Sequence, residues 1–181
     1  MDIYKLKFTT LQNEIFRLFC IKAGATLNQR QVARLLKVSA TAVGKSIKML
    51  EEEGLIKLAK SKTMNLTSIE FNRNNPKAIA LKRVENLKLV YESGLADFLE
   101  ESFPGCAVIL FGSYSLGEDI ENSDIDIAVI GSKEKRMELK RFDKLLERTI
   151  YIHFYENIAK INKHLRSNIL NGISLTGAIE L

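Results

Sequence analysis

The chain has 181 residues, which suits one large domain or two small ones, and its apolar fraction of 46% is ample for a packed core. Only two prolines are present, which argues against disorder, and the longest apolar run, residues 106–111, is far shorter than a membrane span. The first residues show no signal-peptide pattern. Cys20 and Cys106 both lie in apolar patterns, so we expect two buried thiols in a cytoplasmic protein that has no contact with a membrane.

The charge is unevenly divided along the chain. Residues 1–75 carry 13 Lys and Arg against 6 Asp and Glu, a net charge of +7, whereas residues 76–181 carry 14 against 16, a net charge of −2. This division favours a nucleic-acid-binding module joined to a module with a different task. The alternative is a lysine-rich, well-solvated surface without a nucleic-acid partner.

Three helices are expected in the N-terminal part. Thr9 or Thr10 can cap the first, Asn28 caps a short second helix, and Ser39 caps a third that ends at Gly54. In each segment apolar residues recur at intervals of three and four, which gives one buried face.

Two strands are expected next, over residues 55–59 and 66–71, and a polar tip joins them. Three helices followed by a basic hairpin are the elements of a winged helix-turn-helix, and the chain resembles that family over about residues 8–72. The passages that carry the resemblance are residues 31–36, 39–50 and 53–56.

The resemblance implies that the third helix enters the major groove of double-stranded DNA. Lys45 and Lys48 would neutralise phosphates or donate to guanine, while lysines of the wing would reach the neighbouring backbone. The residues expected to face DNA are Ser39, Thr41, Lys45, Lys48, Lys60 and Lys62, with Ala40 and Gly44 on the same exposed face. A winged helix that serves protein contacts or dimerisation is the alternative.

A connector follows, and Pro76 is well placed in its first helical turn. Its apolar residues recur at helical spacing as far as about Ser102, which predicts one long amphipathic helix. The expected apolar stripe is Val84, Leu87, Tyr91, Leu95 and Phe98. We expect this helix to pack on the second module, and a homodimer that uses the exposed apolar residues near its start is the alternative.

The C-terminal part alternates between strands and helices. The expected elements are a strand over residues 106–111, a turn at Gly112, a strand over residues 124–130, a helix from about 132 to 147, a strand over residues 148–155 and a tail helix that ends at Asn171-Gly172. We therefore expect an α+β fold whose second part is a small mixed sheet with helices packed on one face and a site on the other.

Two features of this part carry chemistry. Gly112-Ser113 leaves a buried strand and offers backbone N–H groups and a hydroxyl to a phosphate. Asp124 and Asp126 are two residues apart on a strand, so their carboxylates point to one face and repel each other unless a cation lies between them. A phosphate cradle beside a carboxylate pair is what metal-dependent phosphoryl or nucleotidyl transfer needs.

These residues resemble the signature of the DNA polymerase beta-like nucleotidyltransferase superfamily, and the size and layout resemble its minimal nucleotidyltransferases over about residues 88–172. The signature residues are Gly112, Ser113, Gly117, Ser123, Asp124 and Asp126. The resemblance implies that the first four bind the triphosphate of an NTP, with Ser123 orienting the turn before Asp124. It also implies that Asp124 and Asp126 bind Mg²⁺ or Mn²⁺ and are catalytic.

The sequence departs from the family at one position. The family usually places a third carboxylate on the next strand, facing the pair, where it helps to activate the acceptor hydroxyl. Here that face presents Tyr151, His153 and Tyr155, and no acid follows until Glu156. His153 lies closest to the expected position, where it is either the candidate base or a residue that merely fills this face of a degenerate site. Loss of the carboxylate would impair turnover more than nucleotide binding.

Two hypotheses of different classes follow. The first is a nucleotidyltransferase that moves a nucleoside monophosphate from an NTP to a hydroxyl acceptor and is attached to a DNA-binding module. The second is a DNA-binding transcriptional regulator that senses nucleotide without efficient catalysis, and an antitoxin-like protein that modifies a partner protein is a further variant. The expected division is a winged helix-turn-helix domain over residues 1–75, a connecting helix over 76–104 and a nucleotidyltransferase domain over 105–181.

Overall fold

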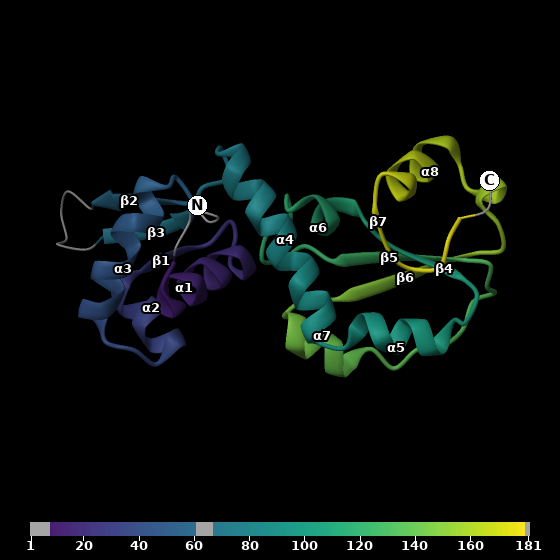
Figure 1. Cartoon of the computed structure of the whole chain (residues 1–181), viewed down its shortest axis with the longest axis horizontal. Coiled ribbons are helices and arrows are strands. Elements are labelled where there is room, and N and C mark those ends of the chain that lie inside the picture. Colours follow the sequence, from purple (N-terminus) through teal and green to yellow (C-terminus); the bar gives the residue numbers. More distant parts are fainter. Residues whose placement is uncertain (1–7, 61–66, 180–181) are drawn as a thin grey trace, which may run out of the picture. The chain divides into compact units, whose positions relative to one another are not determined.

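The structure is a computed structural model, and it describes residues 8–60 and 67–179. The chain divides into two compact units, Met1–Ile79 and Ala80–Leu181, each with its own small sheet (Figure 1). This mixture of helices and sheets confirms the predicted α+β class. Within the described ranges, no helix combines the length and the apolar character that crossing a bilayer requires.

The helices of the first unit begin where their capping residues predict. They are α1 (Thr10–Ile21), α2 (Gln29–Leu36) and α3 (Ala40–Glu52). Thr9, Asn28 and Ser39 each accept a hydrogen bond from a backbone N–H of the first turn, which satisfies a donor that has no partner inside the helix. Local capping chemistry therefore sets the helix starts.

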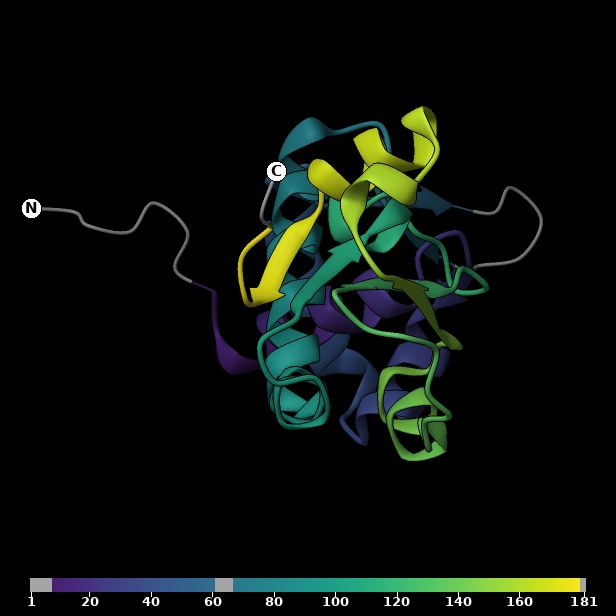
Figure 2. The ribbon, with the colours of Figure 1, turned by 90° about the vertical axis from the view of Figure 1, so that its right-hand side faces the viewer.

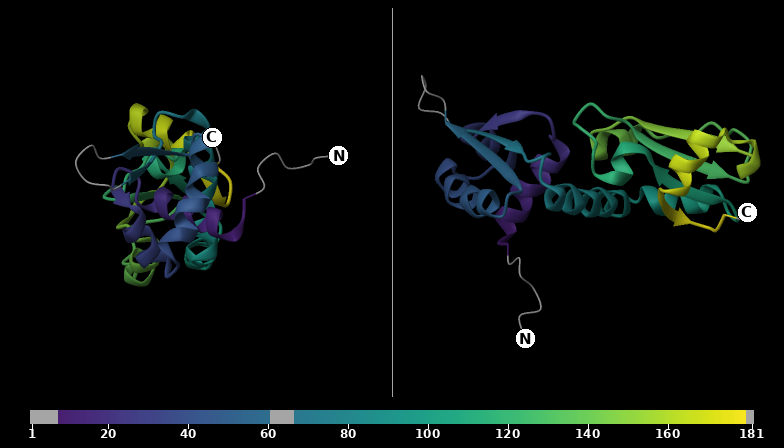
Figure 3. Two further views of the ribbon diagram at one scale, coloured as in Figure 1. Left: turned by 90° about the vertical axis from the view of Figure 1, so that its left-hand side faces the viewer. Right: turned by 90° about the horizontal axis from the view of Figure 1, so that it is seen from above.

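The sheet of the first unit consists of β1 (Thr26–Asn28), β2 (Ile56–Lys60) and β3 (Thr67–Phe71), in the order β1-β3-β2 with antiparallel pairs. The wing strands β2 and β3 lie side by side (Figure 3). β1 was not predicted, because it is only three residues long and ends at the residue that caps α2.

The connector is not one helix, and this prediction was wrong. It consists of α4 (Pro76–Glu92) and α5 (Leu95–Ser102), which run in different directions (Figure 1). The break falls at Gly94, whose φ of 73° is left-handed and cannot continue a right-handed helix.

The buried face of α4 also differs from the predicted apolar stripe. Val84 and Tyr91 are 63% and 48% exposed, whereas Lys82, Asn86 and Val90 are buried at intervals of four. Because two of these buried residues are polar, an apolar pattern could not identify the face.

The sheet of the second unit has the order β6-β5-β4-β7. Its strands are β4 (Ala107–Phe111), β5 (Ile125–Ile130), β6 (Ile150–Tyr155) and β7 (Ile173–Thr176). β4 pairs antiparallel with β5 and β7, and β5 pairs parallel with β6. The strands β4, β5 and β6 were predicted, but β7 was not.

Four helical segments complete the unit: α6 (Gly112–Leu116), α7 (Lys140–Leu146), the 3-10 helix η1 (Ile158–Lys160) and α8 (Lys163–Leu170). The predicted helix from 132 to 147 is wrong in its first half, because residues 132–139 form no regular element. Residues 133–136 are all charged and exposed, so a helix there would have no face to bury. Asn162 divides the predicted tail helix, because its side chain caps α8.

Apolar clusters cover both faces of this sheet. On one face Val108, Leu110 and Ile127 pack with Leu99 of α5 and Phe142 of α7. On the other face Ile109 and Ala128 pack with Ile158, Ile161 and Ile169 of the tail segment, η1 and α8. Figure 2 shows α8 on one side of the strands and α5 with α7 on the other. The tail segment thus packs on the face that we expected to be open.

Candidate functional site

The Gly112 turn lies directly against Asp126. β4 ends at Phe111, and α6 begins at Gly112, which has a left-handed φ of 73°. A Cβ atom at Gly112 would lie 2.9 Å from Asp126 Oδ2, so only glycine allows this approach without displacing the carboxylate. The following Ser113 is exposed. The two halves of the sequence signature are therefore adjacent in space.

The loop between α6 and β5 is held by its own hydrogen bonds. Gly117 ends α6, and the N–H of Glu118 donates to the carbonyl of Ser113 at 3.0 Å. Ser123 closes the next turn: its Oγ accepts from the N–H of Ile120 at 3.0 Å, and its own N–H donates to the Ile120 carbonyl at 2.9 Å. The loop thus leads to Asp124, which is exposed and precedes the first residue of β5.

Asp126 and His153 form a hydrogen-bonded pair. Alternation along β5 and β6 places both on the face that the tail segment also covers. His153 Nε2 lies 3.0 Å from Asp126 Oδ1, and the side chains are 39% and 35% exposed. The Phe111 ring packs edge-on to the His153 ring with centroids 5.5 Å apart. One oxygen of a signature carboxylate, Asp126 Oδ1, therefore already has a hydrogen-bond partner in the protein, the His153 imidazole.

No third carboxylate approaches this pair from β6. Tyr151 and Tyr155 accompany His153 on its face, and burial raises the pKa of Tyr155. Glu156 is exposed and forms an ion pair with Lys160, whose hydrogen bond lowers the pKa of Glu156. Glu156 is therefore already paired elsewhere.

The donor set suits a hard divalent cation that also binds the nucleotide. Over the described ranges, no three side chains of His, Cys, Asp or Glu converge on a point where they could hold a metal ion. Mg²⁺ commonly binds one or two carboxylates together with substrate phosphates rather than an all-protein cage. The exposed Asp124 and the half-buried Asp126, which lies against the Gly112 turn, fit that requirement.

A buried polar network behind the loop was missed from the sequence. Asp119 is 1% exposed and receives hydrogen bonds from Lys82, Asn86 and Arg148. Asn86 also donates to the carbonyl of Tyr114 in α6 at 2.9 Å. The available signal was the period of four that joins Ala78, Lys82, Asn86 and Val90, but polar residues on a helix are normally assigned to solvent.

The DNA-facing prediction concerns α3 and the wing. Ser39, Thr41, Lys45 and Lys48 are exposed, as expected. Ala40 and Gly44 are half-buried instead, because the Gln29 side chain lies against Gly44 and donates to the Ala40 carbonyl at 2.8 Å. Lys62 lies outside the described residues, and Lys60 is described only by its backbone at the end of β2.

Comparison with protein families supports both halves of this description. Residues 92–175 match the model of the nucleotidyltransferase domain. Residues 18–57 match a model described as winged helix-turn-helix DNA-binding. The chain joins a winged helix-turn-helix domain to a nucleotidyltransferase domain. No curated protein sequence matches the chain.

Solved structures that resemble parts of the chain are bacterial regulators. One is the adhesin competence repressor AdcR from Streptococcus pyogenes, with 20% identity over 56% of this chain and 71% of that chain and a TM-score of 0.43. Another is Lactococcus lactis ZitR, a zinc-responsive MarR family member, with 23% identity over 54% of this chain and 67% of that chain and a TM-score of 0.38. ZitR in complex with DNA matches at 22% over 56% and 64%, with a TM-score of 0.39. At these identities the likeness concerns the fold alone.

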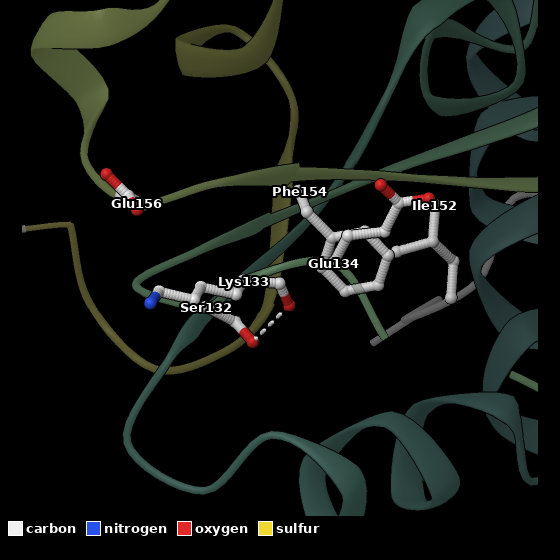
Figure 4. Close-up of a pocket in the computed structure, with 6 residues that line it drawn as sticks. All are labelled: Ser132, Lys133, Glu134, Ile152, Phe154 and Glu156. Carbon is white, nitrogen blue, oxygen red and sulfur yellow. Dashed lines mark hydrogen bonds between the residues drawn. The ribbon is translucent and has the colours of Figure 1, made fainter. Parts of the chain in front are cut away.

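The nucleotidyltransferase domain contains a pocket of about 390 Å³ whose lining includes no signature residue, and Figure 4 shows the residues that line it. Its lining residues come from the segment after β5 and from β6: Ser132, Lys133, Glu134, Ile152, Phe154 and Glu156. Ile152 and Phe154 alternate with His153 along β6, so they point to the opposite face of the sheet. This pocket is therefore separate from the Asp126–His153 pair.

Proposed function

We propose that the nucleotidyltransferase domain binds an NTP with a divalent cation and transfers the nucleoside monophosphate to a hydroxyl acceptor. The observation that carries the proposal is the contact between Gly112 and Asp126, which joins a glycine-serine turn to a signature carboxylate. The family match over residues 92–175 supports the same assignment.

In this proposal, triphosphate binding, the shape of the loop and metal binding fall to different residues of the chain. Backbone N–H groups of the Gly112-Ser113 turn and the Ser113 hydroxyl bind the triphosphate, while Gly117 and Ser123 hold the loop in shape. Asp124 and Asp126 hold Mg²⁺ or Mn²⁺. A bound divalent cation at such a site supplies neutralisation of the triphosphate charge and a lower barrier for the attacking hydroxyl.

His153 is the proposed base. An ionised carboxylate only accepts hydrogen bonds, so a hydrogen bond to Asp126 requires the proton on Nε2 and leaves Nδ1 able to take one. The acceptor oxygen forms a bond to the α-phosphorus, the bond from that phosphorus to the bridging β-phosphate oxygen breaks, and pyrophosphate leaves. The hydroxyl proton passes to His153 Nδ1.

The winged helix-turn-helix domain is proposed to bind double-stranded DNA through α3 and the wing. The exposed side chains of Thr41, Lys45 and Lys48 support this, with Ser39 at the helix start and Lys60 and Lys62 on the wing. We also propose a homodimer, for which the exposed apolar side chains of Val84 and Tyr91 on α4 are the support.

Incubation of the protein with α-phosphate-labelled NTPs, Mg²⁺ and candidate hydroxyl acceptors tests the enzyme proposal. Label should pass to an acceptor with the wild-type chain and fail to pass with Asp124→Ala/Asp126→Ala. Nucleotide binding without transfer of label to any acceptor would contradict the enzyme proposal.

The second candidate function is a regulator that senses nucleotide without efficient catalysis. The hydrogen bond from His153 to Asp126, in a site without a third carboxylate, favours it, because one signature oxygen already has a protein partner. An antitoxin-like protein that modifies a partner protein is a variant of the enzyme proposal, and protein hydroxyls among the acceptors test it. DNA binding that changes with NTP in the wild type but not in the Asp124→Ala/Asp126→Ala variant would support the sensing mechanism, and wild-type DNA binding that NTP leaves unchanged would reject it.

A further inference from the structure

We infer that Asp119 is a positioning residue that, through the buried network of Lys82, Asn86 and Arg148, fixes the loop of residues 117–124 that joins the proposed phosphate-binding turn to the signature aspartates. The inference rests on the proposed function for its nucleotide readout. Its structural readout, the rigidity of the loop, is independent of any ligand.

The network is enclosed by the protein. Lys82 is 0% exposed, Asn86 2% and Arg148 5%. Asp119 Oδ1 accepts from Lys82 Nζ and, at 2.7 Å, from Asn86 Nδ2. Asp119 Oδ2 accepts from Arg148 Nη2 at 3.3 Å. One carboxylate thus receives donors on both of its oxygens, which fixes its position and its orientation.

These donors come from different elements around the loop. Lys82 and Asn86 lie one turn apart on α4, and Arg148 lies between α7 and β6. Asn86 also donates to the Tyr114 carbonyl, so the same side chain holds α6 and the loop that follows it. The network therefore fixes both segments that carry the signature residues.

Stability alone does not account for such a network. Well-packed apolar residues in place of a buried ion pair are often neutral or stabilising, because burying charges removes their hydration. Hydrogen bonds are directional, so the network gives the loop a defined geometry, whereas apolar contacts alone would allow the loop to shift. Asp119, which the network holds, lies two positions after Gly117 and five before Asp124, within the loop whose shape places the signature residues.

The decisive experiment replaces the charged members together, as Lys82→Met/Asp119→Leu/Arg148→Met, in the full chain. We expect a denaturant midpoint close to that of the wild type, but amide hydrogen exchange at least about tenfold faster across residues 112–126. The dissociation constant for an NTP with Mg²⁺ should rise by about tenfold or more. The matched control is Lys88→Gln/Glu92→Gln, which removes an exposed pair on the same helix and should change none of these three quantities.

A second variant covers the case in which the triple variant does not fold. Lys82→Met/Asp119→Asn removes one charge of each sign and keeps one acceptor oxygen, which can serve Asn86 or Arg148 but not both. This variant should therefore retain more of the exchange protection of residues 112–126 than Asp119→Ala, which keeps no acceptor.

Unchanged exchange of residues 112–126 in the triple variant would overturn the inference. If that variant does not fold, an Asp119→Ala variant whose exchange rises equally throughout residues 80–179 would overturn it, because the role would then be structural. If the wild type binds no NTP, the proposed function fails while the exchange comparison still decides the role of Asp119.

Discussion

Asp126 on β5 and His153 on β6 are hydrogen-bonded at 3.0 Å across two parallel strands, and His153 lies on the strand where the sequence resemblance leads us to expect a third carboxylate. An imidazole in this place avoids the charge repulsion that a third carboxylate would add beside Asp126. The pair should therefore tolerate the absence of a metal better than three carboxylates would.

Replacing His153 by aspartate tests this relationship. His153→Asp loses a hydrogen bond, which costs about 1 kcal/mol, and adds a negative charge beside Asp126. In metal-free buffer the melting temperature should fall by several degrees, and Mg²⁺ should restore it. Calorimetry with and without Mg²⁺ measures both effects. His153→Asn, which adds no charge, is the control, and an equal Mg²⁺ response of the two variants would contradict the argument.

Gly112→Ala should disable the site without unfolding the domain. Alanine in a left-handed conformation costs about 1–2 kcal/mol, and its Cβ would lie 2.9 Å from Asp126 Oδ2, so the carboxylate must move. Nucleotide affinity measured by titration calorimetry should fall by about tenfold or more. Gly94→Ala is a matched control, because Gly94 has the same φ of 73° and no atom lies within 4 Å of its Cβ. Equal losses of affinity in both variants would refute the role of the Asp126 contact.

Lys45→Ala and Lys48→Ala should each weaken DNA binding. Both lysines are exposed on α3, and each phosphate contact removed should lower the slope of log affinity against log salt by about 1. Fluorescence anisotropy over a series of salt concentrations measures this slope. Lys163→Ala in α8 is the control and should bind like the wild type. Unchanged slopes in both α3 variants would mean that α3 does not face DNA.

Glu156 should not act as the missing carboxylate. Its folded-state pKa is lowered by Lys160, so the stabilising pair is present above the ordinary pKa of 4.5 and is lost as the pH falls through the lowered value. Lys160→Ala should raise the pKa of Glu156 toward 4.5, as measured by carbon NMR titration, with nucleotide binding unchanged. A Glu156→Gln variant that loses nucleotide binding would show that Glu156 does belong to the site.

Much of the fold was predictable because it depends on short-range chemistry. The caps Thr9, Asn28 and Ser39 and the apolar strand before Gly112 act within a few residues, so the sequence displays them directly. The signature spacing likewise predicted the Gly112 turn and Asp126, which the structure places side by side.

The missed features depend on distant partners. Among the described strands β7 pairs only with β4, far back in the chain, and the burial of Lys82 and Asn86 is explained by their hydrogen bonds to Asp119. The break at Gly94 was visible as a glycine, but the apolar residues on both sides of it suggested continuity. In each of these features tertiary contacts, rather than the local sequence pattern, determined the structure.

The pairing of β7 with β4 also sets an order of events during synthesis. Every element wholly within the first unit is complete by residue 71, whereas β4 gains its second neighbour only when residues 173–176 have emerged from the ribosome. Because domains fold as units from the N-terminus, the nascent chain should be able to bind DNA before it can hold nucleotide. Until then the apolar β4 edge beside Gly112 remains open to wrong partners, which makes this interval the vulnerable one for aggregation.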